Sequence, residues 1–254
     1  MRIILLTQND PFYLAENLQF LIESIPKNFT IVAAVNFDVS PFGKKESFLN
    51  KSLKTLSIFG VRFFIYYSIK FLVNFFDKRK SVKFVLENNQ IPLVHLSNGV
   101  NHPKSLAILK EYNADIMVSI AGNQIFKQPL IDMAPNGILN LHTALLPKYR
   151  GLMPSFWVLR NCEETTGVSV FFVDRGIDSG EIIIQREINI DDVSQEELII
   201  MTKRIGITAI VDALICIEND NVSLIENDIV KGSYYSFPTR SDVHAFLKAD
   251  KRFF

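Results

Sequence analysis

Two polar side chains stand two residues apart at the end of an apolar run, in the segment GILNLH at residues 137–142. Residues i and i+2 of a β-strand point to the same face, so Asn140 and His142 share one face and leucines occupy the other. Pro147 cannot continue a β-ladder, which places the pair at or near the carboxyl end of the predicted strand. An amide and an imidazole at that position can polarise a carbonyl oxygen and move a proton.

A carboxylate is predicted to reach the same strand end. The segment DRGIDSGE, residues 174–181, lies between two predicted strands and contains Asp174, Asp178 and two glycines. An amide, an imidazole and a carboxylate that converge suit acyl transfer to an amine, because the amide can hold a developing oxyanion and the carboxylate can orient the imidazole or accept the amine proton. The same residues also occur without a catalytic role, as core or capping groups and as a plain Asp-Ser-Gly hairpin turn.

The composition of the chain excludes several classes of protein. The chain has 254 residues, 48% hydrophobic and 21% charged, which is typical of a folded globular protein. Its 27 basic and 27 acidic residues cancel, so the strong positive field of a dedicated nucleic-acid binder is missing. Cys162 and Cys216 form no metal or redox motif, which fits a reducing cytoplasm. The opening MRIILLTQND has too short an apolar run for a secretory signal and predicts a first strand.

Several common catalytic motifs are missing from the sequence. TQNDPF follows the first predicted strand, so neither a GxGxxG fingerprint nor a phosphate-binding P-loop forms there. The sequence also has no HExxH, no His/Cys group with metal spacing and no GxSxG elbow. The chemistry carried by Asn140, His142 and Asp178 needs neither a metal nor a protein nucleophile.

Apolar strands alternate with helical patterns over the first two thirds of the chain. This predicts an α/β fold with a Rossmann-like, open and mainly parallel sheet, whose sites lie at the carboxyl ends of the strands. The strands are expected at residues 2–7, 30–35, 91–96, 114–122 and 137–142, and helices at 15–25, 82–88 and 104–112.

The last third changes character. Two further strands are expected at residues 166–174 and 180–190, and the sequence SQEE predicts a capped helix that runs toward residue 218. Residues 221–227 are expected to form a short strand pair, and an aromatic, basic tail follows. We therefore expect a catalytic domain over residues 1–190, with a helix and tail over 191–254 that complete or cover it.

Residues 53–76 are rich in aromatic side chains and nearly continuous in hydrophobicity. Lys54, Arg62 and Lys70 interrupt the segment, so no stretch reaches the ~18 to 20 uncharged residues of a spanning helix. Apolar residues lie almost all round the helical wheel, which favours a core helix or a homodimer contact. Contact with a membrane surface is the alternative, because basic and aromatic residues suit that position.

The segments NLHTALLPKYRGLMPSFW and TGVSVFFVDRGIDSGEIIIQ together resemble the N10-formyltetrahydrofolate-dependent formyltransferase family. That family includes methionyl-tRNA, glycinamide-ribonucleotide and sugar-nucleotide N-formyltransferases. The resemblance implies the formyltransferase type of Rossmann-like sheet and N10-formyltetrahydrofolate as the co-substrate. It also implies that Asn140 polarises the formyl carbonyl, His142 stabilises the tetrahedral intermediate, and Asp178 orients His142 and relays the amine proton.

The resemblance further implies two groups of binding residues. In the family, the pterin lies between the loop after the preceding strand and the loop that bears the aspartate; IAGNQI, at the first position here, departs from the family's AYGxILP-like segment. The loop LLPKYRG is expected to border the acceptor amine, with Arg150 holding the loop. The implied co-substrate residues are Ile120, Ala121, Gly122, Asn123, Gln124, Ile125, Asp174, Gly176 and Ile177, and the implied acceptor residues are Lys148, Tyr149, Arg150 and Gly151.

The identity of the acceptor amine is inferred by excluding the other acceptors of the family. The family's tRNA enzymes carry an extra C-terminal barrel for which this chain is too short, and a net charge of zero lacks a phosphate-binding field. The ribonucleotide enzymes have a glycine-rich phosphate loop that TQNDPF does not match. We therefore expect a nucleotide-linked amino-sugar for surface polysaccharide, with SYYSFPTR able to contact the nucleotide. The alternatives are methionyl-tRNA or another amine, a lipid-linked amino-sugar, hydrolysis of formyltetrahydrofolate, and a folate-binding protein without turnover.

Overall fold

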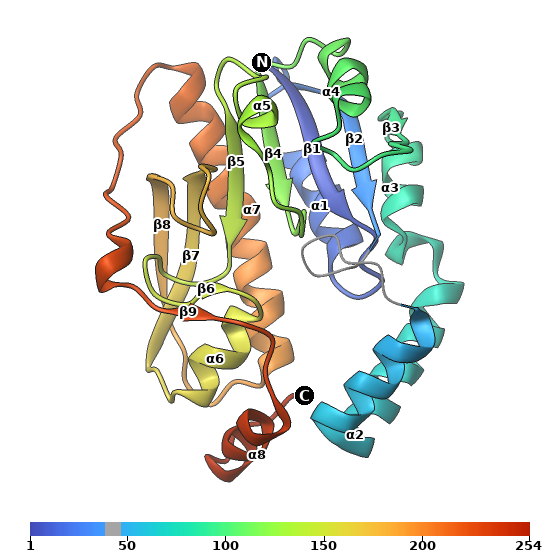
Figure 1. The fold of residues 1–254 in the computed structure, drawn as a ribbon, viewed down its shortest axis with the longest axis vertical. Coiled ribbons are helices and arrows are strands. Elements are labelled where there is room, and N and C mark those ends of the chain that lie inside the picture. The colour runs from blue at the N-terminus through green and yellow to red at the C-terminus, as the bar shows by residue number, and fades with distance from the viewer. Residues whose placement is uncertain (39–46) are drawn as a thin grey trace.

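A seven-stranded sheet forms the centre of the computed structural model, which describes residues 1–38 and 47–254 (Figure 1). The strand order is β3-β2-β1-β4-β5-β7-β8, in which β1 to β5 run parallel and β7 and β8 are antiparallel. The predicted open, mainly parallel α/β sheet is thereby confirmed. The strands are β1 (Arg2–Gln8), β2 (Thr30–Phe37), β3 (Leu93–Val94), β4 (Ile116–Ile120), β5 (Ile138–His142), β7 (Thr165–Phe172) and β8 (Ile182–Asn189).

The central strands are apolar on both faces because helices cover both faces of the sheet. In β1, Ile3 and Leu5 belong to one buried cluster and Ile4 and Leu6 to the other, as a side-chain period of two requires. The first cluster lies under α1 (Leu14–Ser24), α3 (Val82–Asn88) and α7 (Gln195–Glu218), and the second under α4 (Pro103–Lys110) and α5 (Gln128–Ile131).

Helix α7 begins at the capping box that the sequence predicts. The Ser194 hydroxyl accepts a hydrogen bond from the Glu197 N–H at 3.2 Å, and the Glu197 carboxylate accepts one from the Ser194 N–H at 2.7 Å. Residues of α7 such as Ile207 and Ile210 are buried in the same cluster as β1 and β5. The segment after residue 190 therefore supplies part of the main core.

The chain after α7 returns to the middle of the molecule. β9 (Tyr234–Tyr235) pairs with β6 (Arg150–Gly151), after the short helix η3 (Ile229–Lys231). α8 (Arg240–Lys248) then packs against α6 (Pro154–Arg160) in an aromatic cluster around Phe156 and Phe246. The strand pair predicted at residues 221–227 is wrong: Ile225 forms a single antiparallel bridge with Ile182, because this stretch crosses the edge of β8 instead of folding back on itself.

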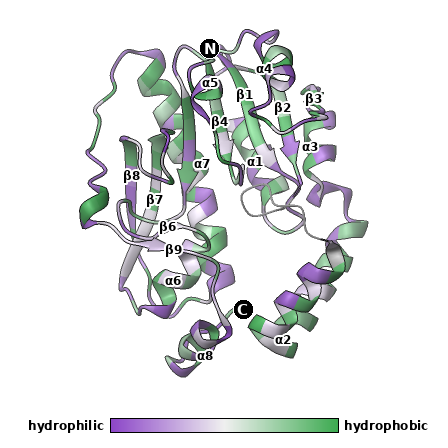
Figure 2. Cartoon of the chain, in the orientation of Figure 1, coloured by the Kyte–Doolittle hydropathy of each residue, from purple (hydrophilic) through white to green (hydrophobic). Residues whose placement is uncertain are grey.

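Helix α2 (Phe48–Phe76) stands outside the layers that cover the sheet and lies near α8 (Figure 1). Gly60, with φ of 84°, interrupts it and separates two helical segments. The predicted core helix is wrong, because many of the large apolar side chains of α2, from Leu49 to Phe76, are exposed. Figure 2 shows hydrophobic and hydrophilic residues mixed along this helix. By length and composition alone, residues 49–76 are the one helix in the described ranges that would suffice to cross a membrane. The short helix η2 (Lys78–Lys80) connects α2 to α3.

Candidate active site

The polar pair of the GILNLH segment lies at the carboxyl end of β5. Asn140 is in register with Ser119 of β4, and His142 faces Ser169 of β7. Leu139 belongs to the cluster under α7, so Asn140 and His142 point to the opposite face. The Asn140 amide makes no hydrogen bond with any residue in the described ranges, which leaves its N–H groups available to a bound carbonyl.

His142 has a partner on each side of its ring and is only 5% exposed. Its Nε2 lies 2.7 Å from the backbone carbonyl oxygen of Tyr149. Because a carbonyl oxygen can only accept, Nε2 is the donor in this contact and carries a hydrogen. The other ring nitrogen, Nδ1, faces the Asp178 carboxylate, 3.6 Å from Oδ2.

Asp178 lies in the loop between β7 and β8, with a left-handed backbone at φ of 49°. Its Oδ2 accepts a hydrogen bond from the Gly151 N–H at 2.8 Å, so the same oxygen faces both His142 and the loop after β5. The Asn227 amide donates to the carbonyl oxygens of Asp178 and Gly180, at 3.1 and 2.9 Å. These bonds fix the carboxylate beside the imidazole. The sequence analysis missed Asn227, because nothing local connects it to a loop 49 residues away.

We expect replacement of Asn227 by alanine to lower kcat about tenfold and to leave the KM values nearly unchanged. Two hydrogen bonds that position the Asp178 loop are lost, and each contributes about 1 kcal/mol. A loss of about 1.4 kcal/mol in transition-state stabilisation lowers a rate tenfold, so part of this energy is sufficient for the expected effect. Steady-state kinetics on the purified protein measures this split. Asn221→Ala, at an exposed asparagine, is the matched control, and a loss confined to thermal stability would contradict a positioning role.

The side chain of Tyr149 supports the loop after β5. The Tyr149 side chain is buried, donates a hydrogen bond to Glu163 at 2.5 Å, accepts one from Asn161 at 3.2 Å and stacks on Tyr235. Burial, followed by the hydrogen bond with Glu163, raises the pKa of Tyr149 above its usual value, so the phenol stays neutral. This tyrosine therefore supports the loop with its ring and holds His142 with its carbonyl.

The other expected acceptor residues differ in exposure. Lys148 is exposed, and Arg150 is half-buried with Nη1 3.4 Å from the Ile177 carbonyl oxygen, which links this loop to the Asp178 loop. Gly151 has φ of 97°, and a Cβ at this position would lie 2.2 Å from the Tyr235 carbonyl oxygen. Only glycine fits there, directly beside the carboxylate that its N–H binds.

The loop after β4 has unpaired backbone N–H groups that can hydrogen-bond a heterocyclic ring. Ala121 and Asn123 have left-handed backbones, and the N–H groups of Gly122, Asn123 and Gln124 donate to no protein acceptor within the described residues. Ile120 and Gly122 are buried, whereas Ile125 is half exposed. Unpaired backbone groups beside a strand end can hydrogen-bond the edge of a ring such as a pterin, so this segment fits the implied co-substrate.

The second implied co-substrate segment lies next to the first. Arg175 donates to the Gln128 side chain at 2.7 Å, which ties the Asp178 loop to the start of α5. Within that loop, Asp174 accepts hydrogen bonds from the Gly176 N–H and the Ser179 hydroxyl, while Ile177 is half-buried. The structure thus brings the predicted residues of both loops to one edge of the sheet.

Two cavities, of about 280 and 580 Å³, lie elsewhere: one under α4 and one between α1, η2 and α3. Neither is lined by Asn140, His142 or Asp178, so the candidate site is defined by its side-chain contacts. Across residues 1–38 and 47–254, no group of three or more His, Cys, Asp or Glu side chains could hold a metal ion.

An imidazole held against a carboxylate, beside an unpaired amide at the carboxyl edge of a Rossmann-like sheet, defines an α/β protein with a site suited to acyl transfer. Residues 76–214, more than half of the chain, match the model of the formyl transferase family, and the chain belongs to that family. The resemblance drawn from the two sequence segments is confirmed.

Individual relatives agree with this assignment. A methionyl-tRNA formyltransferase from Clostridioides difficile is 37% identical over 114 residues, covering 44% of this chain and 37% of that protein. The chain spans between about a third and a half of the curated relatives it matches.

Solved structures share the fold. An N-formyltransferase from Helicobacter canadensis, in complex with folinic acid and dTDP-3-aminofucose, has a TM-score of 0.59 and 18% identity, and the match covers 98% of this chain and 79% of that one. A phosphoribosylglycinamide formyltransferase from Bacillus halodurans also has a TM-score of 0.59 and 18% identity, with 84% of this chain and 93% of that one covered.

Proposed function

We propose that this protein is an N-formyltransferase that moves a formyl group from N10-formyltetrahydrofolate to a primary amine. The observation that carries the proposal is the convergence of Asn140, His142 and Asp178 at the end of β5, in a chain of the formyl transferase family. Relatives crystallised with folinic acid and with 5-N-formyl-THF support a folate co-substrate.

The bound formyl donor would supply an electrophilic carbonyl carbon. Transfer joins the amine nitrogen to that carbon, breaks the bond between the carbon and N10, and moves one proton from the amine to N10. The Asn140 amide would hold the carbonyl oxygen as negative charge develops on it. Asp178, together with Nδ1 of His142, would carry the proton, since their contact at 3.6 Å lets the carboxylate stabilise a charged imidazolium.

We propose a nucleotide-linked amino-sugar as the acceptor, used for surface polysaccharide. A net charge of zero gives little attraction for tRNA, and the match to the enzyme complexed with dTDP-3-aminofucose extends over 98% of the chain. Tyr234, half exposed beside Gly151, offers a ring on which a nucleotide base can stack. Arg240 is exposed six residues further on and suits a phosphate.

A methionyl-tRNA acceptor is the second candidate, and several sequence relatives favour it, because they are methionyl-tRNA formyltransferases. Hydrolysis of formyltetrahydrofolate would need water in place of the amine. A folate-binding protein without turnover would retain the fold and would not need the unpaired amide of Asn140.

The deciding experiment is incubation of the purified chain with N10-formyltetrahydrofolate and a panel of nucleotide-linked amino-sugars, with methionyl-tRNA as a parallel acceptor. The expected result is a mass gain of about 28 Da on one amino-sugar, the difference between N–H and N–CHO in acyl transfer. A gain on methionyl-tRNA alone would overturn the acceptor, and release of formate without any acceptor would identify a hydrolase.

We place this reaction in the cytoplasm, where reduced folates and nucleotide-linked sugars are substrates. The homodimer stays a prediction. Sedimentation velocity at micromolar concentration would check it.

A further inference from the structure

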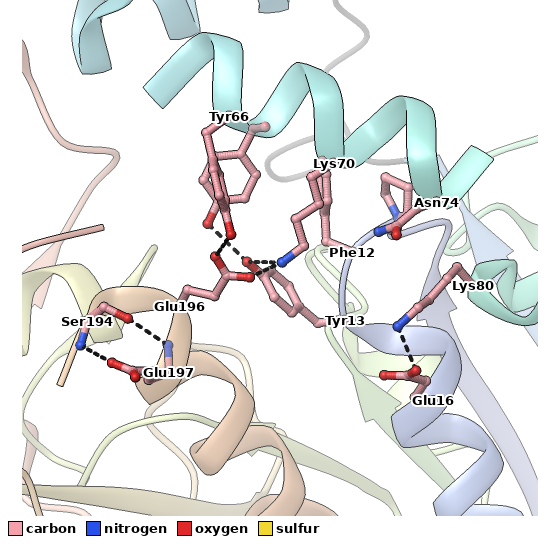
Figure 3. Close-up of polar contacts among 12 residues, drawn as sticks. Phe12, Tyr13, Glu16, Tyr66, Lys70, Asn74, Lys80, Ser194, Glu196 and Glu197 are labelled. Atoms are coloured by element: carbon pink, nitrogen blue, oxygen red, sulfur yellow. Dashed lines mark hydrogen bonds and ion pairs between the residues drawn. The ribbon is translucent and has the colours of Figure 1, made fainter. Parts of the chain in front are cut away.

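The second segment of α2, residues 61–76, faces the protein with a mixed side: Phe63 and Phe71 pack on aromatic rings of the body, and the polar side chains of Tyr66, Lys70 and Asn74 point the same way (Figure 3). Lys70 forms an ion pair with Glu196 of α7, and Tyr66 donates a hydrogen bond to the same carboxylate at 2.7 Å. Asn74 donates to the Pro11 carbonyl oxygen at 2.8 Å. These contacts hold α2 against the body of the protein through this inner side.

The opposite side of the helix is apolar and faces outward. A residue in an α-helix returns to the same side after three or four positions, and the exposed residues follow that spacing. We call these residues the outer face of α2; each is between 52% and 81% exposed, and they are Val61, Ile65, Ile69, Leu72, Val73, Phe75 and Phe76. A contiguous apolar surface of this kind marks an interaction site, since isolated soluble proteins rarely display one.

The charge near the outer face is mainly basic. α2 contains no acidic residue, and residues 47–83 contain eight lysines and arginines against one acid, Asp77. Four of the eight, Lys70, Arg79, Lys80 and Lys83, pair with carboxylates. Arg62 is exposed at the border of the outer face, and Lys78 and Arg79 are exposed directly beyond its end at Phe76. The face is therefore apolar in the middle and basic at its edges.

This combination selects between two occupants. A second copy seated on the outer face would bring lysines and arginines toward each other, with no acidic side chain on α2 to balance them. Anionic lipid headgroups supply the opposite charge, and the acyl boundary accepts the apolar side chains. We propose that the outer face of α2 binds an anionic membrane surface, with the helix lying in the plane of the interface.

The contacts of Lys70 and Asn74 define how the helix would lie. Lys70 contacts α7, and Asn74 contacts the loop after β1. One side of α2 is therefore attached to the protein, and its outer face is free. An interfacial position uses that single face, whereas a spanning helix would have to leave these partners. The inference does not depend on the proposed enzymatic function, because α2 contributes no side chain to the candidate active site.

The test is co-sedimentation of the full chain with vesicles of phosphatidylcholine, with and without about 30% phosphatidylglycerol. We expect binding to the vesicles that contain phosphatidylglycerol, weakening at least tenfold when the salt concentration rises or the anionic lipid is omitted. The triple variant Ile65→Asn, Ile69→Asn and Phe76→Asn should bind at least tenfold more weakly. The control is Ile200→Asn on α7, because Ile200 is 51% exposed and apolar but lies outside the outer face.

Equal vesicle binding by the triple variant and the wild type would overturn the proposal, and so would a wild type that binds neither kind of vesicle. A wild-type dimer that the triple variant dissociates, without vesicle binding by either protein, would assign the face to a second copy. Thermal melting checks the fold of each variant, and the formyl-transfer assay can fail or succeed independently of these results.

Discussion

His142→Ala is expected to lower the rate of formyl transfer by about 10²- to 10⁴-fold, the range that a positioned acid or base contributes. The imidazole is buried, fixed by the Tyr149 carbonyl and aimed at Asp178, so no neighbouring group can take its place at the end of β5. The KM for the folate should change far less, because the ring is not part of the implied co-substrate segments. Single-turnover measurement with saturating formyl donor reports the chemical step directly.

His95→Ala is the matched control for this variant, since His95 is exposed and directly follows β3, which three strands separate from β5 in the sheet. The cavity that His142→Ala leaves also lowers the stability of the variant, so the rate has to be measured well below its melting temperature. If His142→Ala retained wild-type turnover, the catalytic assignment would be wrong. If the wild type bound folate without turnover and His142→Ala bound it equally well, the chain would be a binding protein.

Asp178→Asn is expected to lower kcat about 10²-fold or more while preserving the fold. The amide has nearly the same size as the carboxylate, tolerates the left-handed backbone and can still accept from the Gly151 N–H through its oxygen. It cannot carry the amine proton and cannot stabilise a charged imidazole at Nδ1. The loss should therefore appear in kcat, with the melting temperature nearly unchanged.

Asp220→Asn provides a close control, because Asp220 also has a left-handed backbone, with φ of 50°, and lies at the exposed end of α7. Kinetics of both variants against the same amine would separate the charge of Asp178 from its backbone geometry. Full activity of Asp178→Asn toward every accepted amine would exclude a role in proton transfer.

Strand periodicity was sufficient to place Asn140 and His142 on one face at a strand end, and the β7–β8 connection was sufficient to bring Asp178 within reach. These features are encoded by local spacing. The partners that fix them are not: the Tyr149 carbonyl depends on the path of a loop, and Asn227 arrives from a segment without any pattern of its own.

The sequence was likewise insufficient to predict which side of α2 contacts the rest of the protein. A helical wheel shows how apolar residues are distributed, but not which side finds partners. The side of α2 that faces the protein is fixed in part by Glu196, 126 residues from Lys70, and by a backbone carbonyl in the loop after β1. Burial of a tyrosine cluster strengthens that choice, since Tyr67 shares a hydrogen bond with Tyr13 and burial raises the pKa of Tyr67 to about 12.

The pairing of β6 with β9 sets the order in which the candidate site is completed during synthesis. The Arg150 N–H donates to the Ser233 carbonyl oxygen and the Leu152 N–H to the Tyr235 carbonyl oxygen, on either side of the glycine whose N–H binds Asp178. The three polar residues of the site leave the ribosome more than fifty residues before Tyr235 does. The β6–β9 pairing beside these reactive groups therefore cannot form in a nascent chain until residues 233–235 have been made.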